Sequence, residues 1–310
     1  VKSARYRGYD LSDAYSGHAT EIAQDISRTI PTACIVAAGG DGTIAEIVQG
    51  IAGTAVTLAI CPIGTANVFA LELGIPFEES RNIDTLLYGK IKHVYPGEII
   101  TEGKSEKFIQ MAGIGLDSDI VLRVSKRFKY YCGKMAYVVQ ALSSLLFYDF
   151  KPIRLEIDGQ LHEAVSVIIS KGRLYAGRYA LCARSMQEEK HFSVILIKSR
   201  TIPAFLSIVL KGMGFGGGGS RYMDCILARD ITLIAPQDMP IQCDGDIKGH
   251  TPARVRVCAS SIKKECRDTP ACPAPGIALA VATDDAASFL TCAYRVCVGV
   301  RGGIRTHGPR

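Results

Sequence analysis

The sequence lacks any uncharged apolar run of about 18 or more residues, which excludes a helix that crosses a membrane. It has no Gly-x-x-x-x-Gly-Lys-Ser/Thr and no Gly-x-Gly-x-x-Gly after a strand, which excludes a Walker loop and a dinucleotide fingerprint. None of its 11 cysteines forms Cys-x-x-Cys or a zinc-finger spacing with histidines. It shows no signal-peptide pattern and no initial Met, so we expect a cytoplasmic protein whose sequence begins inside a longer chain.

The composition indicates a globular protein. Of 310 residues, 48% are hydrophobic and 21% are charged, which allows one large domain or two ordinary ones. The net charge of +6 suits phosphates or an anionic surface but is too small to indicate nucleic acid. Cysteines inside apolar runs, such as Cys34 in residues 33–36, are typical of small buried side chains in a reducing compartment.

Strand-like and helix-like patterns alternate over residues 1–93. Apolar spacing predicts helices over residues 19–26, 44–51 and 66–73, and all-apolar runs predict buried strands at 33–38 and 55–60. This alternation predicts an α/β domain with a parallel sheet.

Short β-rich runs dominate residues 94–262 and predict an antiparallel, β-sandwich-like domain. The runs are residues 154–159, 164–169, 192–197 and 253–257, with a hairpin turn at Asp158-Gly159. Helices are expected at 134–147 and 202–210. Residues 263–310 have no clean periodicity and are rich in Cys, Pro and Ala, so we expect a disordered, non-native tail or a short real extension.

The first chemical motif is Gly39-Gly40-Asp41-Gly42-Thr43, between a predicted strand and a predicted helix. Glycines allow a sharp turn and a close approach to a ligand, and the N–H groups at the helix start can hold phosphate oxygens. Asp41 would repel phosphate unless Mg²⁺ bridges the two, so the motif favours Mg²⁺. A tight turn with Asp41 as a cap explains the string alone about equally well.

The second motif, Pro62-Ile63-Gly64-Thr65-Ala66-Asn67, follows the next predicted strand. Two adjacent strand ends form one crevice at the carboxyl edge of a sheet, where α/β proteins bind ligands. Thr65 can donate its hydroxyl to phosphate or cap a helix, and Asn67 can hydrogen-bond a nucleotide.

Together the two motifs resemble the diacylglycerol kinase catalytic-domain family, which includes sphingosine kinases and bacterial lipid kinases. The resemblance covers roughly residues 10–260, because further motifs follow in the family's order. They are Gly17-His18-Ala19, Gly113-Ile114-Gly115-Leu116-Asp117, Tyr175-Ala176-Gly177 and Gln242-Cys243-Asp244-Gly245-Asp246.

The resemblance implies an ATP- and Mg²⁺-dependent lipid kinase acting on a diacylglycerol-like hydroxyl, with a nucleotide domain facing a β domain. It implies that the ligands of ATP are Gly39, Gly40, Asp41, Gly42, Thr43, Gly64, Thr65 and Asn67. Asp41 would also act through the metal, Asp117 would join an acidic network, and Asp246 would accept the lipid proton. Without the resemblance, Asp117 and Asp246 would be interpreted as solvated or capping residues.

Four features depart from the family pattern. The usual opening strand with its Asn-Pro turn is absent, and Asp13 stands where a Thr commonly contacts nucleotide. Asp246 replaces a Glu, which shortens its reach by about 1.5 Å. Glu188-Glu189-Lys190 replaces an Asp-Asp-Gly turn that helps to form a structural Mg²⁺ site, which puts that second metal in question.

A basic and aromatic stretch at 126–131 leads into an apolar helix at 137–147. The two could bring the protein to an anionic membrane surface and hold an acyl chain. Alternatively, the helix packs on the β domain and the basic side chains are solvated. We therefore expect a lipid alcohol and a peripheral membrane surface as partners, expect no nucleic acid, and predict no oligomeric state.

Two other functions are compatible with parts of the sequence. A soluble NAD kinase also uses Gly-Gly-Asp-Gly, but residues 62–67 and 242–246 fit the lipid kinases better. An inactive lipid- or nucleotide-binding module is favoured by the missing strand and by Asp246.

Overall fold

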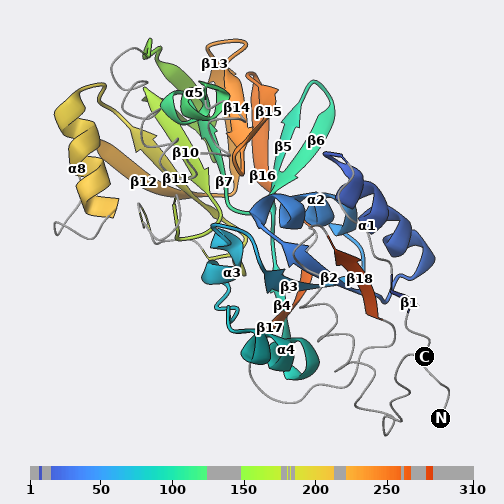
Figure 1. Ribbon diagram of the computed structural model, residues 1–310. Coiled ribbons are helices and arrows are strands. Elements are labelled where there is room, and N and C mark those ends of the chain that lie inside the picture. The colour runs from blue at the N-terminus through green and yellow to red at the C-terminus, as the bar shows by residue number, and fades with distance from the viewer. Residues whose placement is uncertain are drawn as a thin grey trace, which may run out of the picture. The chain divides into compact units, whose positions relative to one another are not determined.

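The computed structural model describes two units of the chain (Figure 1). One comprises Val1–Lys92 with Lys263–Arg310, and the other His93–Ile262. The described residues are 7–8, 15–123, 148–175, 180, 182, 186–212, 221–259, 262–266 and 277–281. The segments predicted at 126–131 and 134–147 lie outside them, as does Asp13.

The first unit is a six-stranded sheet in the order β1-β18-β2-β3-β17-β4. The strand pairs β1–β18, β18–β2, β2–β3 and β3–β17 are all parallel, as the alternating pattern predicts. The elements up to β4 are β1 (Arg7–Gly8), α1 (His18–Thr29), β2 (Cys34–Gly39), α2 (Asp41–Ile51), β3 (Thr57–Pro62), α3 (Val68–Glu72), α4 (Glu79–Tyr88) and β4 (Lys90–Val94).

Apolar spacing explains how the first helices pack. α1 and α2 lie side by side, and a Cβ on Gly50 would lie only 2.7 Å from Cβ of Ala23 (Figure 1). β2 is buried along its whole length, which suits an all-apolar central strand. The helix predicted over 66–73 is shorter, because Asn67 and Gly74 adopt left-handed backbone conformations with φ of 48° and 66°.

Two strands fall in the segment for which the sequence predicts a disordered tail. β17 (Ile262–Cys266) pairs with β3, and β18 (Ile277–Val281) pairs with β2 along five residues. The prediction is wrong for these two stretches, because the Ile-Ala-Leu-Ala-Val run of β18 is a short apolar strand whose Pro- and Cys-rich flanks hide its pattern. The rest of the tail lies outside the described residues.

The second unit is an antiparallel β-sandwich, as predicted. One sheet has the order β12-β11-β10-β7-β14-β15 and the other β6-β5-β16-β13-β8-β9. The first sheet contains β7 (Met111–Ile114), β10 (Ser166–Ser170), β11 (Phe192–Ile197), β12 (Met223–Ala228), β14 (Pro240–Cys243) and β15 (Asp246–His250). The second contains β5 (Gly97–Thr101), β6 (Lys104–Phe108), β8 (Ile153–Ile157), β9 (Gln160–Ala164), β13 (Asp230–Ala235) and β16 (Ala253–Val257).

Side chains from both sheets form one core. Phe108 of β6 and Phe192 of β11 stack across the sandwich with ring centroids 5.8 Å apart, and both are fully buried. The strand predicted at 164–169 is divided, because Ala164 ends β9 and Ser166 begins β10.

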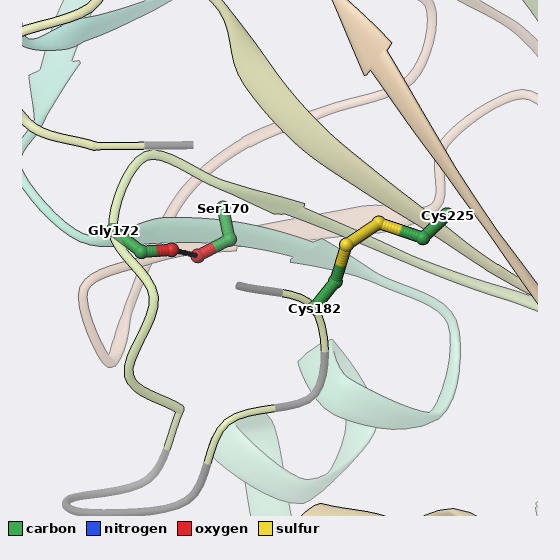
Figure 2. The surroundings of a disulfide bond; sticks show 4 residues. All are labelled: Ser170, Gly172, Cys182 and Cys225. Atoms are coloured by element: carbon green, nitrogen blue, oxygen red, sulfur yellow. Dashed lines mark hydrogen bonds between the residues drawn. A yellow bond between two sulfur atoms is a disulfide. The ribbon is translucent and has the colours of Figure 1, made fainter. Parts of the chain in front are cut away.

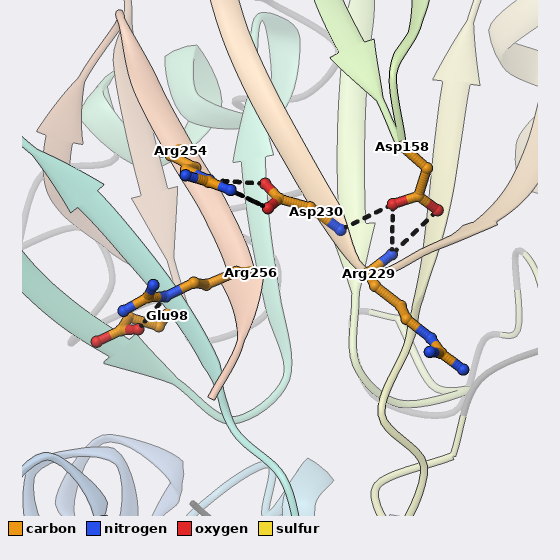
Figure 3. A network of polar contacts seen from close by, with 6 residues as sticks. All are labelled: Glu98, Asp158, Arg229, Asp230, Arg254 and Arg256. Carbon is orange, nitrogen blue, oxygen red and sulfur yellow. Dashed lines mark hydrogen bonds and ion pairs between the residues drawn. The ribbon is translucent and has the colours of Figure 1, made fainter. Parts of the chain in front are cut away.

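The predicted hairpin at Asp158-Gly159 joins β8 and β9, and both turn residues have positive φ. The carboxylate of Asp158 accepts hydrogen bonds from the backbone N–H groups of Arg229 and Asp230 (Figure 3). On the same sheet Arg254 pairs with Asp230, and the hydrogen bond from Arg254 lowers the pKa of that carboxyl. Such exposed pairs contribute little stability, so the stability of this sheet comes mainly from the hairpin turn and the apolar core.

Helices α5 (Leu116–Arg123) and α8 (Ile202–Gly212) pack with residues of the first sheet in a second apolar cluster. The cluster includes Cys182 and Cys225, which form a disulfide (Figure 2). For these two residues the prediction of reduced thiols is wrong, because the fold brings them together from positions 43 residues apart. Cys34, Cys61, Cys243 and Cys258 are buried and take no part in a disulfide, which agrees with the prediction for Cys34. Among the described helices, none has the length and apolar character to span a bilayer.

Candidate active site

The two glycine-rich motifs lie at the ends of neighbouring strands. β2 ends at Gly39 and β3 at Pro62, and the parallel register pairs these two residues. The loops that follow therefore emerge at the same edge of the sheet. This is the arrangement that the order of strands and helices predicts.

The loops also contact each other through backbone atoms. A Cβ on Gly64 would lie 2.4 Å from Cα of Gly40, so only glycine fits there. The carboxylate of Asp41 accepts hydrogen bonds from the backbone N–H groups of Val68, at 3.0 Å, and Phe69, at 2.9 Å. Asp41 thus caps α3 from a different loop and ties the two motifs together.

Several polar groups at this edge are available to a ligand. The first N–H groups of α2 have no acceptor within the helix, and a Cβ on Gly42 would meet nothing within 4 Å. Thr65 is exposed and Thr43 is partly exposed. Asn67 donates to the carbonyl of Gly64 at 2.6 Å, while its buried Oδ1 has no hydrogen-bond partner among the described residues. All the predicted nucleotide ligands are therefore gathered in the first unit.

Asp117 lies in the second unit, in the first turn of α5. Its Oδ1 accepts a hydrogen bond from the hydroxyl of Tyr175, and its Oδ2 accepts one from Nε2 of Gln242, both at 2.6 Å. Burial raises the pKa of Asp117, and the two hydrogen bonds act in the opposite direction. Burial, then the charge of Asp117, raise the pKa of Tyr175 well above its usual value, so Tyr175 remains a donor.

Gly113 leaves space for this network. A Cβ at this position would lie 1.8 Å from Oδ2 of Asp117 and 2.9 Å from Nε2 of Gln242. The glycine is therefore required by a side-chain contact and not by an unusual backbone conformation.

The hairpin between β14 and β15 is joined to the same network. Oε1 of Gln242 accepts a hydrogen bond from the backbone of Gly245 at 2.9 Å. The carboxylate of Asp244 accepts three more, from the N–H groups of residues 109–111. Asp246 lies two residues further along, and its exposed side chain has no partner within the part of the chain that the structure describes.

Hydrogen bonds of Gln242 thus link Asp117, at the start of α5, to the β14–β15 hairpin that carries Asp246. The sequence assigned no role to Tyr175, Gln242 or Gly113, although all three lie in motifs that carry the family resemblance. A signal for Gln242 was present, because a polar amide in the apolar run of a β-strand needs buried partners.

Comparisons with known proteins identify the family and the fold. Residues 3–99 match the family model described as "Diacylglycerol kinase catalytic domain", and residues 111–263 match "YegS C-terminal NAD kinase beta sandwich-like domain". A protein of Bacillus subtilis (strain 168) named "Diacylglycerol kinase" is 26% identical over 79% of this chain and 82% of its own length.

Two further similarities extend this result. A Pseudomonas putida protein named "Probable lipid kinase YegS-like" is 31% identical over 68% of this chain and 70% of its own length. The crystal structure of a diacylglycerol kinase from Bacillus anthracis str. Sterne has the same fold, with a TM-score of 0.65 and 23% identity over 82% of this chain and 83% of that one.

Proposed function

This chain belongs to the diacylglycerol kinase family, and on this premise we propose that it transfers the γ-phosphate of ATP to the hydroxyl of a lipid alcohol such as diacylglycerol. The observation that carries the proposal is the joining of the two glycine-rich loops by Asp41. It leaves a cradle of backbone N–H groups and threonine hydroxyls at one edge of the sheet.

We propose that the phosphates of ATP lie at the start of α2, where N–H groups without an acceptor inside the helix attract anions. Gly40 and Gly42 allow the phosphates to approach the backbone closely. The hydroxyls of Thr43 and Thr65 would donate to phosphate oxygens. The Oδ1 of Asn67, for which the described part of the chain offers no donor, would accept a hydrogen bond from the nucleotide.

The residues present also fit a Mg²⁺ ion carried by the nucleotide. Each carboxylate oxygen of Asp41 accepts a hydrogen bond from one backbone N–H, which leaves it capacity to accept another ligand. Mg²⁺ bound with phosphates needs only one or two protein carboxylates, directly or through water. When bound, the ion would neutralise charge on the phosphate oxygens during transfer.

For proton removal we propose Asp246. A proton acceptor must be an accessible carboxylate held in a fixed position, and Asp246 is exposed on a hairpin that is held by the hydrogen bonds of Asp244 and Gln242. Asp117 would maintain the orientation of Gln242, and therefore of the hairpin, through its paired hydrogen bonds. Asp246 would take the lipid hydroxyl proton as the oxygen attacks phosphorus.

We further propose that the protein acts at the surface of a membrane without crossing it. A lipid alcohol with two acyl chains is held in a bilayer, so the enzyme must reach it there. The net charge of +6 favours an anionic surface.

The test is transfer of label from γ-labelled Mg-ATP to acceptors in mixed micelles. The acceptors are diacylglycerol, monoacylglycerol, sphingosine, ceramide and phosphatidylglycerol, with soluble NAD as the competing acceptor. We expect a labelled lipid with the unchanged chain, and a loss of about 10²-fold or more in Asp246→Asn. Asp238→Asn is the matched control, because Asp238 is also an exposed turn residue of the second unit.

If label is found in NAD alone, the acceptor is a nucleotide and not a lipid. Absence of label from every acceptor, with Mg-ATP binding intact, would favour a binding module. Full activity of Asp246→Asn would show that Asp246 is not the proton acceptor, but it would not contradict the proposed kinase activity.

A further inference from the structure

Lys171 is a lysine with no exposed surface, which is unusual for this residue type. It follows the last residue of β10, and its backbone N–H donates to the carbonyl of Gln110 at 2.8 Å. Its side chain runs into the turn at residues 186–189. There Nζ donates to the carbonyl oxygens of Glu189 at 2.6 Å, Met186 at 2.8 Å and Gln187 at 3.5 Å.

The three carbonyl oxygens explain how the ammonium group is tolerated. A buried charge is costly unless hydrogen bonds replace its hydration, and an ammonium has three N–H donors for three acceptors. Converging backbone carbonyls are also the kind of oxygen ligand that a hard metal cation takes. In this turn they surround a cation that belongs to the chain itself.

The acidic side chains of the turn are arranged differently from metal ligands. Oε2 of Glu189 accepts a hydrogen bond from the backbone of Met186 at 3.0 Å and lies 3.1 Å from Nε2 of His191. Glu188 is exposed. The structural Mg²⁺ that the family resemblance implies near residues 188–190 therefore does not fit, because Nζ of Lys171 occupies the space between the carbonyls.

The turn is connected to the candidate active site by a short series of contacts. Nε2 of Gln187 donates to the carbonyl of Ile109 at 2.8 Å. The N–H of Ile109 in turn donates to the carboxylate of Asp244 at 2.6 Å. Asp246 lies two residues beyond Asp244 on the same hairpin. A shift of the turn would therefore reach the hairpin through two hydrogen bonds.

We propose that Lys171 serves as the built-in cation of this turn, which therefore requires no metal ion, and that it is a positioning residue for the 244–246 hairpin. The first part is independent of the reaction. Only the effect on transfer through Asp246 depends on the proposed function.

The test is thermal unfolding without nucleotide or lipid, in EDTA and in Mg²⁺. We expect the same Tm for the unchanged chain in both solutions. Lys171→Met replaces lysine by an unbranched side chain that is one atom shorter and uncharged, so its Tm should fall by roughly 10 °C. Lys190→Met is the control, because Lys190 is exposed in the same turn and its Nζ lies over the ring of Tyr95, 4.9 Å from the ring centroid, so its Tm should change by about 2 °C or less.

A second measurement starts from the unchanged chain, whose lysine signals do not depend on how a variant folds. With ¹⁵N-labelled lysine, the hydrogen-bonded ammonium of Lys171 should give a slowly exchanging signal that Lys190→Met retains. In Lys171→Met the backbone amide resonances of Gly245 and Asp246 should change position. In Lys190→Met the same resonances should stay where they are in the unchanged chain.

Three results would overturn the proposal. They are a Tm of the unchanged chain that falls in EDTA and recovers in Mg²⁺, a Lys171→Met variant that melts like Lys190→Met, and the absence of any slowly exchanging ammonium. None of these measurements requires kinase activity, so a failed lipid assay would leave the outcome unaffected.

Discussion

The side-chain amide of Gln242 donates a 2.6 Å hydrogen bond to the carboxylate of Asp117, across 125 residues of sequence. The oxygen of the same amide accepts a hydrogen bond from the backbone N–H of Gly245, so only one orientation of the group satisfies both contacts. One side chain thus connects the start of α5 to the hairpin that carries Asp246.

Gln242→Glu tests this connection, because it removes the hydrogen bond to Asp117 and keeps the size of the side chain. The new carboxylate cannot donate to Asp117 and repels it, so we expect turnover to fall by at least tenfold with little change in KM for ATP. Steady-state kinetics with the lipid acceptor measures the change. Gln160→Glu, at an exposed position of β9, should match the unchanged chain, and equal rates for the two variants would contradict the role of Gln242.

Gly113→Ala tests the space beside Asp117. A methyl group there would lie 1.8 Å from Oδ2, so Asp117 must leave Tyr175 and Gln242 or the strand must shift. We expect a loss of about 1–3 kcal/mol in the free energy of unfolding, measured by urea denaturation, and a loss of transfer. An alanine variant with normal stability and normal rate would show that Asp117 lies elsewhere.

The glycines of the nucleotide loops should respond differently to the same substitution. Gly64→Ala places a Cβ 2.4 Å from Cα of Gly40 and should lower the free energy of unfolding by about 1–3 kcal/mol. Gly42→Ala meets no atom within 4 Å, so it should fold normally and weaken binding of Mg-ATP instead. Denaturation together with calorimetric titration of Mg-ATP would distinguish them, and the reverse pattern would disprove the cradle.

Asp41→Ala should affect stability as well as chemistry. The carboxylate caps α3, so its removal should cost about 1–2 kcal/mol of unfolding free energy, in addition to abolishing transfer and weakening Mg-ATP binding. Asp25→Ala, at an exposed position on α1, is the matched control for denaturation. Loss of transfer with unchanged stability would mean that the cap is dispensable.

The raised pKa of Asp117 predicts a pH dependence of stability. Because the pKa is higher in the folded chain than in the unfolded one, the folded state retains a proton that the unfolded state has already lost. The contribution of this group is therefore full below the unfolded pKa and declines as pH rises through the folded value.

Asp117→Asn removes this titration. Its Tm relative to that of the unchanged chain should therefore increase as pH is raised from about 4 to 7. Differential scanning calorimetry at several pH values measures the difference. A relative Tm that decreases over this range would mean that Asp117 is ionised more easily in the folded protein.

Local patterns predicted the parallel sheet, the sandwich and the two glycine-rich loops, because each depends on residues close together in sequence. The helix at 44–51 and the turn at Asp158-Gly159 are examples. The roles of Tyr175 and Gln242 could not be predicted in this way, since both depend on pairing across the β-sandwich. For the same reason the sequence indicated Asp41 as a possible cap but could not identify α3 as the helix it caps.

The placement of β17 and β18 has a consequence for synthesis of the protein. Both strands belong to the first unit, yet they are translated only after the whole second unit. On the ribosome the second unit can therefore complete its sandwich first, at a stage when β18, the neighbour of β2 in the sheet, has not yet been synthesised. We infer that the sheet bearing the glycine-rich loops reaches its final strand order last, after a long-range closure that is slow by its nature.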